Sequence, residues 1–125
     1  MHTETTLVCV TAQRSCQRLI HRGAEIAHSY DTPLLVLFVS GSGFNVLTNP
    51  SVSTVMNELY AVSAQVGAEM TMLQSSTPKA AISGFIRDRH VKHLILGQGR
   101  PDPNGMVAQL MNEFPTVTFH IEPGE

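Results

Sequence analysis

The chain has 125 residues, of which 42% are hydrophobic and 14% are charged, and its formal net charge is −2 at pH 7. This length suits a single domain spanning residues 1–125, and the composition excludes an intrinsically disordered chain. The basic residues form no dense cluster, which argues against a nucleic-acid surface, and no apolar run approaches the roughly 18 residues of a membrane span.

The amino terminus and the two cysteines bear on the cellular compartment. The first residues, MHTETT, include an acidic side chain and no apolar run, so they do not have the pattern of a signal peptide. Cys9 falls in an apolar strand and Cys16 in the following helix, which suggests no disulfide framework and suits a reducing environment. We therefore expect a soluble, cytoplasmic protein that binds neither membranes nor nucleic acid.

Two buried strands with a helix between them are predicted in the first third of the chain. Residues 7–10 and 34–39 are continuous apolar runs, which are typical of parallel strands buried on both faces. Between them, apolar side chains from Cys16 to Ala27 recur at helical spacing, with charged side chains on the opposite side. This helix should end before Pro33, because proline disfavours a helical residue before it.

Two further helices and a weaker strand are predicted next. The apolar side chains of residues 52–66 repeat at intervals of three and four, which predicts a long amphipathic helix that Gly67 is placed to end. Residues 69–73 form a weaker third strand. Thr77 and Pro78 then predict a helix start, with a hydroxyl cap followed by proline at the first helical position. The inner face of this helix is predicted to consist of Ala81, Ile82, Phe85 and Ile86.

The last third of the chain predicts two strands around a short helix. Residues 94–96 are the fourth buried strand, and Asp102 with Pro103 repeats the helix-start signal. Pro115 ends this final helix, and residues 116–121 alternate between apolar and polar side chains, as in an edge strand. The apolar side chains of the short final helix are Val107, Leu110, Met111 and Phe114.

The order of these elements predicts the fold. Strands and helices alternate along the chain, which favours an α/β three-layer sandwich: a five-stranded parallel sheet with helices on both faces. Right-handed crossovers leave few topologies, and we expect the strand order 3-2-1-4-5.

A ligand site is expected at one edge of this sheet. In open α/β sheets, ligands bind beyond the carboxyl ends of the strands, at the point where the strand order reverses. Here that point lies between the first and fourth strands, with the end of the second strand beside it. The candidate ligand-binding residues are Thr11, Ala12, Gln13, Ser15, Val39, Ser40, Gly97, Gln98, Gly99, Arg100, Gly105 and Met106.

The chain resembles the universal stress protein family over nearly its whole length. The resemblance rests on the five-strand order, the length and the late glycine loop in LILGQGRPDPNG, residues 94–105. Two stretches, LVCVTAQRSCQRLIHRGAEIA (residues 7–27) and the ending FHIEP, are similar to the universal-stress-protein-like domain of bacterial potassium-responsive sensor histidine kinases. The resemblance implies an adenine nucleotide alpha hydrolase-like fold and a role in stress response or signalling.

The sequence departs from the pattern of the ATP-binding members of that family. In those members the first strand ends in an acidic residue, and the fourth ends in G-x2-G-x9-G-[ST], whose amides hold phosphates. Here Ala12 matches the acidic position, Gly97 matches the first glycine and Arg100 falls on the second. Only residues 101–104 separate Arg100 from Gly105, where the motif requires nine residues.

The loop also lacks donors that the motif would supply. Met106 stands where the motif has a hydroxyl, and Pro101 and Pro103 remove two amide donors. The usual mode of ATP binding is therefore predicted to be lost. The alternative role for Gly97 and Gly99 is a tight turn beside the sheet.

The remaining sequence suggests no catalytic residue and no metal site. His90 and His93 are three residues apart, but the predicted break between helix and strand falls between them, and no zinc-ligand spacing occurs. No G-x-S-x-G nucleophile motif is present.

The leading hypothesis is a non-catalytic regulatory or stress-response module that binds a ligand or a protein partner. The second is a nucleotide-binding protein for ATP, AMP or cyclic di-AMP with an altered loop, and the third is an enzyme such as a slow ATPase.

The last strand predicts an interface between two copies of the chain. Val117, Phe119 and Ile121 share one side of it, and an unpaired apolar edge would promote aggregation. The resemblance implies dimerisation through this strand, so we expect a homodimer with these three residues at its interface.

Overall fold

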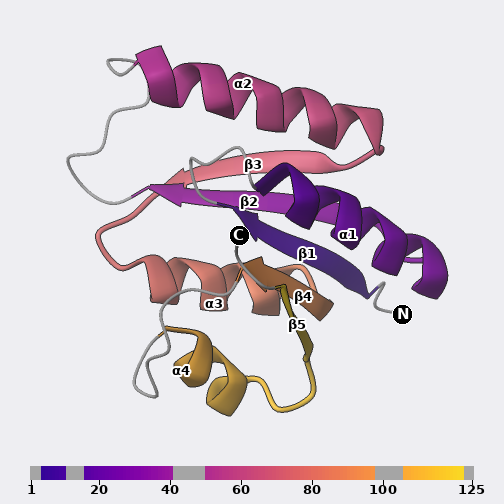
Figure 1. Ribbon diagram of the computed structural model, residues 1–125. Coiled ribbons are helices and arrows are strands. Elements are labelled where there is room, and N and C mark those ends of the chain that lie inside the picture. The colour runs from indigo at the N-terminus through magenta and orange to yellow at the C-terminus, as the bar shows by residue number, and fades with distance from the viewer. Residues whose placement is uncertain (1–3, 11–15, 41–49, 98–105, 123–125) are drawn as a thin grey trace.

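The computed structural model describes residues 4–10, 16–40, 50–97 and 106–122, in which five strands alternate with four helices (Figure 1). The elements are β1 (Thr5–Val10), α1 (Cys16–Tyr30), β2 (Leu34–Ser40), α2 (Pro50–Gln65), β3 (Glu69–Gln74), α3 (Pro78–Asp88), β4 (Val91–Gly97), α4 (Met106–Glu113) and β5 (Thr118–Glu122). Every neighbouring pair of strands is parallel, and the order β3-β2-β1-β4-β5 confirms the predicted topology.

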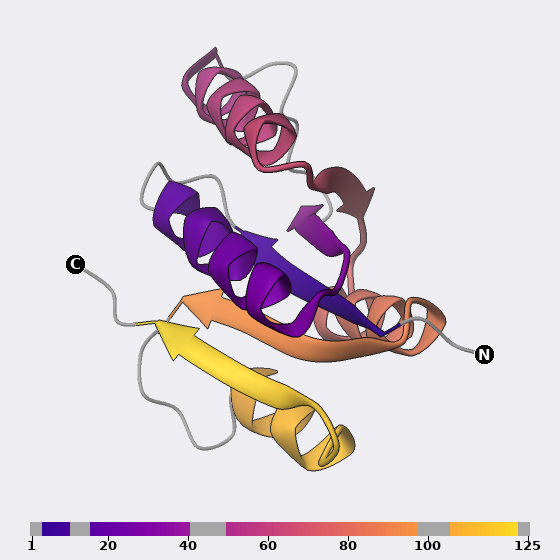
Figure 2. The same cartoon turned by 90° about the vertical axis from the view of Figure 1, so that its right-hand side faces the viewer.

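The sheet carries one hydrophobic cluster on each face. Helices α1 and α2 pack on the first face, where β1 contributes Val8 and β4 contributes Ile95. Helices α3 and α4 pack on the second face, where the same strands contribute Leu7 and Leu94 (Figure 2). Successive side chains of a strand point to opposite faces, so a strand covered on both sides must be apolar throughout. This explains the continuous apolar runs in the sequence.

Strand β1 begins two residues earlier than its apolar run predicts. Thr5 and Thr6 are buried, and both hydroxyls are hydrogen-bonded. The Thr5 hydroxyl donates to the Arg89 carbonyl at 2.9 Å, and Thr6 Oγ1 lies 2.6 Å from Thr32 Oγ1. Because these polar groups are satisfied, β-branched threonine extends the strand as well as valine would.

The end of α2 confirms the role predicted for Gly67. This glycine has a φ of +76°, in the left-handed region where a helix commonly ends. The Ala68 amide then donates to the Ser63 carbonyl at 2.8 Å, which satisfies one of the last carbonyls of the helix. Helix α1 ends in a similar way at Asp31, whose φ is 55°, two residues before Pro33.

Two details of the predicted elements are wrong. Thr77 precedes α3, and proline follows it as expected, but its side chain makes no capping hydrogen bond; instead its amide donates to Ser75 Oγ at 3.0 Å. Strand β5 starts at Thr118, since the amide of Val117 donates to the Phe114 carbonyl in a turn.

One predicted helix start and the prediction about membrane spans need separate comment. The helix start predicted at Asp102 and Pro103 lies outside the described residues. Within the described ranges, no helix is long and apolar enough to cross a membrane.

Helix α1 lies very close to the sheet at Gly23. A Cβ atom added there would lie 2.3 Å from Val8 Cγ2 and 3.2 Å from Leu34 Cδ1. Val8 is fully buried and Leu34 is nearly so, so neither side chain has free space to move into. The spacing between α1 and the sheet therefore depends on a residue without a side chain.

We expect Gly23→Ala to lower the free energy of unfolding by about 1–3 kcal/mol through overpacking, measured by urea denaturation. Gly84→Ala is the matched control, because Gly84 lies in α3 and an added Cβ would meet nothing within 4 Å. The control should gain roughly 0.5–1 kcal/mol from the better helix propensity of alanine. Similar effects from the two substitutions would contradict the close approach at Gly23.

Candidate functional site

The candidate site lies at the carboxyl edge of the sheet, where the strand order reverses. From β1 the chain proceeds to β2 and β3 on one side, whereas β4 and β5 lie on the other. Figure 2 shows β1, β4 and β5 side by side with their arrowheads toward the same edge. Strands β1 and β4 end there at Val10 and Gly97. The reversal therefore lies at the predicted pair of strands.

Gly97 leaves the end of β4 open. It is exposed, and an added Cβ would lie 3.5 Å from Leu19 Cδ1, which is an ordinary van der Waals contact. Its φ lies outside the left-handed region, unlike that of Gly67. The backbone at Gly97 thus does not require glycine, and what glycine provides is an exposed main chain at the edge of the sheet.

The other predicted site residues divide into two groups. Ser40 ends β2 opposite Gln74 of β3, Met106 begins α4, and Val39 is half-buried against the cluster on the α3 and α4 face. The side chain of Val39 thus contributes to the core. The predicted residues that lie outside the described ranges are Thr11, Ala12, Gln13, Ser15, Gln98, Gly99, Arg100 and Gly105.

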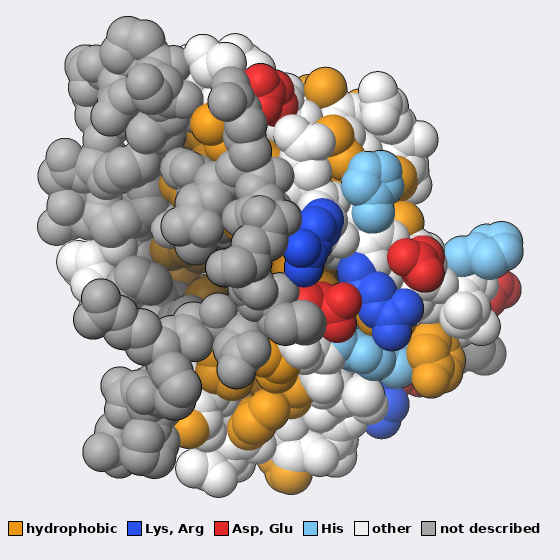
Figure 3. Space-filling view, in the orientation of Figure 1, with side chains coloured by type: hydrophobic (Ala, Val, Ile, Leu, Met, Phe, Trp, Pro, Cys, Tyr) orange, Lys and Arg blue, Asp and Glu red, His pale blue; other side chains and the backbone are white. Residues whose placement is uncertain are grey.

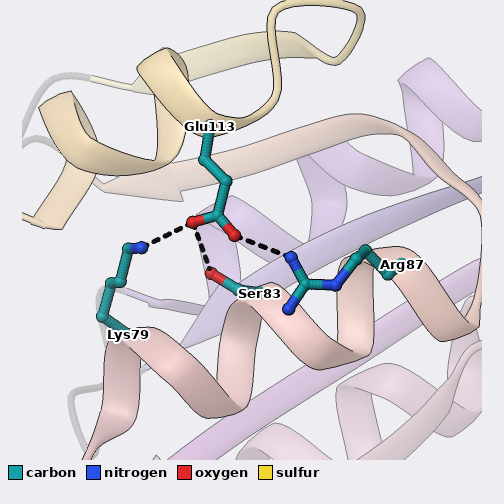
Figure 4. A network of polar contacts seen from close by, with 4 residues as sticks. All are labelled: Lys79, Ser83, Arg87 and Glu113. Carbon is teal, nitrogen blue, oxygen red and sulfur yellow. Dashed lines mark hydrogen bonds and ion pairs between the residues drawn. The ribbon is translucent and has the colours of Figure 1, made fainter.

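A polar network that the sequence analysis missed holds α4 against α3 (Figure 4). The Glu113 carboxylate accepts hydrogen bonds from Lys79, from Ser83 at 3.3 Å and from Arg87 at 2.7 Å. These three donors lie one helical turn apart along α3, which the spacing of four residues could have indicated. Hydrogen bonds from Lys79 and Arg87 lower the pKa of Glu113 below its ordinary value. The network therefore fixes the helix whose first residue stands at the site.

A second contact that the sequence analysis missed joins two histidines. His93 of β4 and His120 of β5 lie 3.2 Å apart between ring nitrogens, whereas the sequence suggested only the neighbouring pair His90 and His93. The parallel pairing of β4 and β5 places His93 opposite Thr118, two residues before His120 on the same face. In the part of the chain that the structure describes, no group of three or more His, Cys, Asp or Glu side chains is arranged to hold a metal ion.

The two cysteines are free thiols, in agreement with the sequence interpretation. Cys9 packs against the cluster on the α3 and α4 face, and burial raises the pKa of its thiol to about 12. Since the thiolate is the nucleophilic form, the raised pKa disfavours reaction of Cys9 at neutral pH. Cys16, at the start of α1, is buried.

Comparison with proteins of known structure identifies the fold. No protein-family model matches the sequence, and no curated protein matches it either. Among solved structures, a universal stress protein from Archaeoglobus fulgidus superposes with a TM-score of 0.68 at 14% identity, covering 98% of this chain and 94% of that one. The fold is that of the universal stress proteins.

Two further universal stress proteins were solved with adenine nucleotides. One, in complex with cAMP, has a TM-score of 0.59 at 14% identity and covers 100% of this chain and 98% of its own. Another from Archaeoglobus fulgidus, in complex with dAMP, has a TM-score of 0.58 at 18% identity, with 98% of each chain covered. Identities this low show a shared fold alone. The finer similarity to sensor histidine kinases stays a prediction.

The Glu113 network leads to a prediction with a definite pH dependence. Because the pKa of Glu113 is lowered in the folded state, the carboxylate stabilises the fold fully above its ordinary pKa of 4.5. This stabilisation is lost as the pH falls through the lower, folded-state pKa. We expect Glu113→Gln to lower the urea midpoint at neutral pH, and the difference from wild type to shrink in acid.

The matched control for this prediction is Glu25→Gln. Glu25 lies on α1, is 70% exposed and faces Arg22 at 3.6 Å. An exposed pair of this kind contributes little to stability, so the control should unfold at nearly the wild-type midpoint. If Glu113→Gln behaved like this control, α4 would not depend on the network.

Proposed function

We propose that the protein is a small, non-catalytic regulatory module of universal stress protein type, which acts in the cytoplasm in stress response or signalling. It works by dimerisation and by binding a ligand or a protein partner at the carboxyl edge of β1 and β4. The proposal is carried by the reversal of strand order at these two strands, since this is where ligands bind in such sheets. The sequence that follows β1 and β4, with Ala12 and a loop shorter than the motif requires, favours loss of the usual ATP-binding loop.

The chemistry of the strand ends supports a role without catalysis. Phosphate transfer or hydrolysis requires groups that position a nucleophile and neutralise developing charge, such as carboxylates with a metal ion or a lysine. Val10 and Gly97, the last residues of β1 and β4, carry no ionisable side chain and offer only hydrocarbon and main-chain groups. Such an edge suits recognition of a ligand or partner better than bond cleavage.

A second candidate function is binding of an adenine nucleotide through an altered loop. The observation in its favour is that two universal stress proteins of the same fold are complexes with cAMP and dAMP. The exposed main chain at Gly97 and the amides at the start of α4 could donate hydrogen bonds to phosphate oxygens. An exposed helix start favours an anion by only about 0.3–1 kcal/mol, so further donors would be needed for tight binding.

Thermal unfolding with and without ATP, AMP, cAMP and cyclic di-AMP separates the two candidates. A ligand present at 100 times its Kd adds about 2.7 kcal/mol of stability, which raises the midpoint by a few degrees in a domain of this size. We expect no rise with ATP, because the usual loop is predicted to be lost. A rise with ATP would contradict the predicted loss of the usual loop, and a rise with any of the four nucleotides would support the second candidate.

Gly97→Val is the control that attributes any such rise to the site. The geometry at Gly97 accommodates a Cβ, so the variant should keep the wild-type circular dichroism spectrum. If the rise in the midpoint disappears in this folded variant, the nucleotide binds at the edge of β4. If the rise persists unchanged, the nucleotide binds elsewhere on the protein.

Dimerisation is the part of the proposal that involves β5. As the last strand of the sheet, β5 leaves one edge of its main chain for a second copy. Val117, Phe119 and Ile121 are partly buried against the protomer's own cluster, so only their exposed parts can contact a partner. The main-chain edge is therefore expected to contribute more to the interface than these three side chains.

We expect wild type to sediment as a dimer and Thr118→Lys to shift it toward monomer. Thr118 is exposed on β5, and like charges brought together across two paired strands disfavour association. Thr118→Val is the matched control, because it keeps the size and β-branching without the charge. A lysine variant that sediments like this control would place the interface elsewhere. Phe119→Asp is less informative, since Phe119 also packs in the protomer.

A further inference from the structure

A pair of histidines connects three elements at one end of the sheet. His93 of β4 is only 5% exposed, and its Nδ1 lies 3.2 Å from Nε2 of the half-buried His120 of β5. The Tyr30 ring at the end of α1 stacks on the His93 ring, with 4.1 Å between centroids and 30° between planes. The pair therefore joins the edge strand β5 both to its neighbour β4 and to α1.

The two faces of β5 are held in different ways. Phe119 and Ile121 point to the α3 and α4 face, where they pack against the apolar cluster. His120 and Glu122 point to the opposite face, where Glu122 Oε1 lies 3.6 Å from Arg22 Nε of α1. Figure 3 shows basic, acidic and histidine side chains gathered on the surface that carries α1. On this face the attachment of β5 is polar and includes the ionisable imidazole of His120.

The contact between the two rings limits how many protons the pair can hold. A neutral imidazole has one N–H and one lone pair, so two complementary combinations of tautomers place one donor opposite one acceptor at the 3.2 Å contact. A first added proton leaves one lone pair facing one N–H, and the hydrogen bond survives. A second added proton places an N–H on both facing nitrogens and a positive charge on both rings. The doubly protonated pair must therefore separate.

The surroundings oppose protonation of both rings. Burial is the main cause that lowers the pKa of His93 below its ordinary value of 6.5, and nearby His120 and Lys92 act in the same direction. Burial and the Arg22 guanidinium of α1 lower the pKa of His120. The opposing charges are Glu4, which raises the pKa of His93, and Glu122, which raises that of His120, but neither reverses the shift.

We propose that His93 and His120 form an acid-sensitive latch, which holds edge strand β5 to β4 and α1 and releases β5 when both rings are protonated. Release exposes the histidines to water, so the open strand binds protons more readily than the closed one. The stability of closed β5 is therefore complete above pH 6.5 and falls as the pH drops below this value through the lower pKa values of the pair. The latch does not depend on which ligand or partner the protein binds.

Hydrogen exchange followed by mass spectrometry tests the latch on the whole chain. Protection of the β5 amides, corrected for intrinsic exchange, is compared with that of β1 from about pH 7.5 down to about pH 5, in buffer containing EDTA. Below pH 6.5 we expect the protection factors of the β5 amides to fall about tenfold per pH unit for each proton that opening takes up. Strand β1, buried at the centre of the sheet, should keep its protection.

Matched substitutions assign the effect to the two rings. His93→Asn and His120→Gln, combined, place amide groups near the positions of the contacting Nδ1 and Nε2 atoms but do not titrate. We expect this double variant to lose the acid response of β5. His21→Gln, an exposed histidine on α1, should keep it. An acid response that persists in the double variant, or that is missing from wild type, would overturn the proposal.

A measurement on wild type keeps the proposal testable if the double variant does not fold. The ring signals of His93 and His120 are followed by NMR during an acid titration. We expect the two rings to titrate together in two steps below the ordinary value of 6.5, with loss of β5 signals at the second step. Rings that titrate independently at the ordinary value, with β5 unchanged, would exclude the latch.

Discussion

The close approach of α1 to the central strand at Gly23 is the contact on which the rest of the structure depends. An added Cβ would collide with Val8, so the helix can lie this low over the sheet only because the position has no side chain. The low position also brings Arg22 within reach of Glu122 and stacks Tyr30 on His93. The same packing therefore closes the core and determines which polar groups of α1 reach the distant strand β5.

Sequence periodicity was sufficient to predict the sheet, because a strand buried on both faces has to be apolar throughout. Residues 34–39 were predicted accurately in this way, and the end of α2 at Gly67 was predicted from its glycine. The same reasoning did not include Thr5 and Thr6 in β1. The extension of β1 depends on hydroxyl partners that are distant in sequence, such as the Arg89 carbonyl. Glu113 and His120 were missed for the same reason, since their partners are 26 to 34 residues away and only the folded chain brings them together.

The candidate site could be located from the sequence, but its chemistry could be predicted only in part. The fold determines where strands end, so the positions of Ser40, Gly97 and Met106 follow from the strand order. Specific recognition depends on side chains that follow the strands, and hydrophobic patterning carries no information about such segments. Alanine at position 12 and the prolines at 101 and 103 are therefore informative, because they concern the donors and charges available to a ligand.

Strand β5 links assembly to protonation if both proposals hold. Pairing of two β5 edges would stabilise the closed strand, and a more stable closed strand would oppose protonation of His93 and His120 more strongly. Coupling free energies are reciprocal, so protonation of the pair must weaken the dimer by the same factor. Acidification would then separate the protomers by loosening the strand through which they associate, while the apolar clusters around β1 stay intact. The edge of the sheet would in this way respond to pH independently of the ligand site at the ends of β1 and β4.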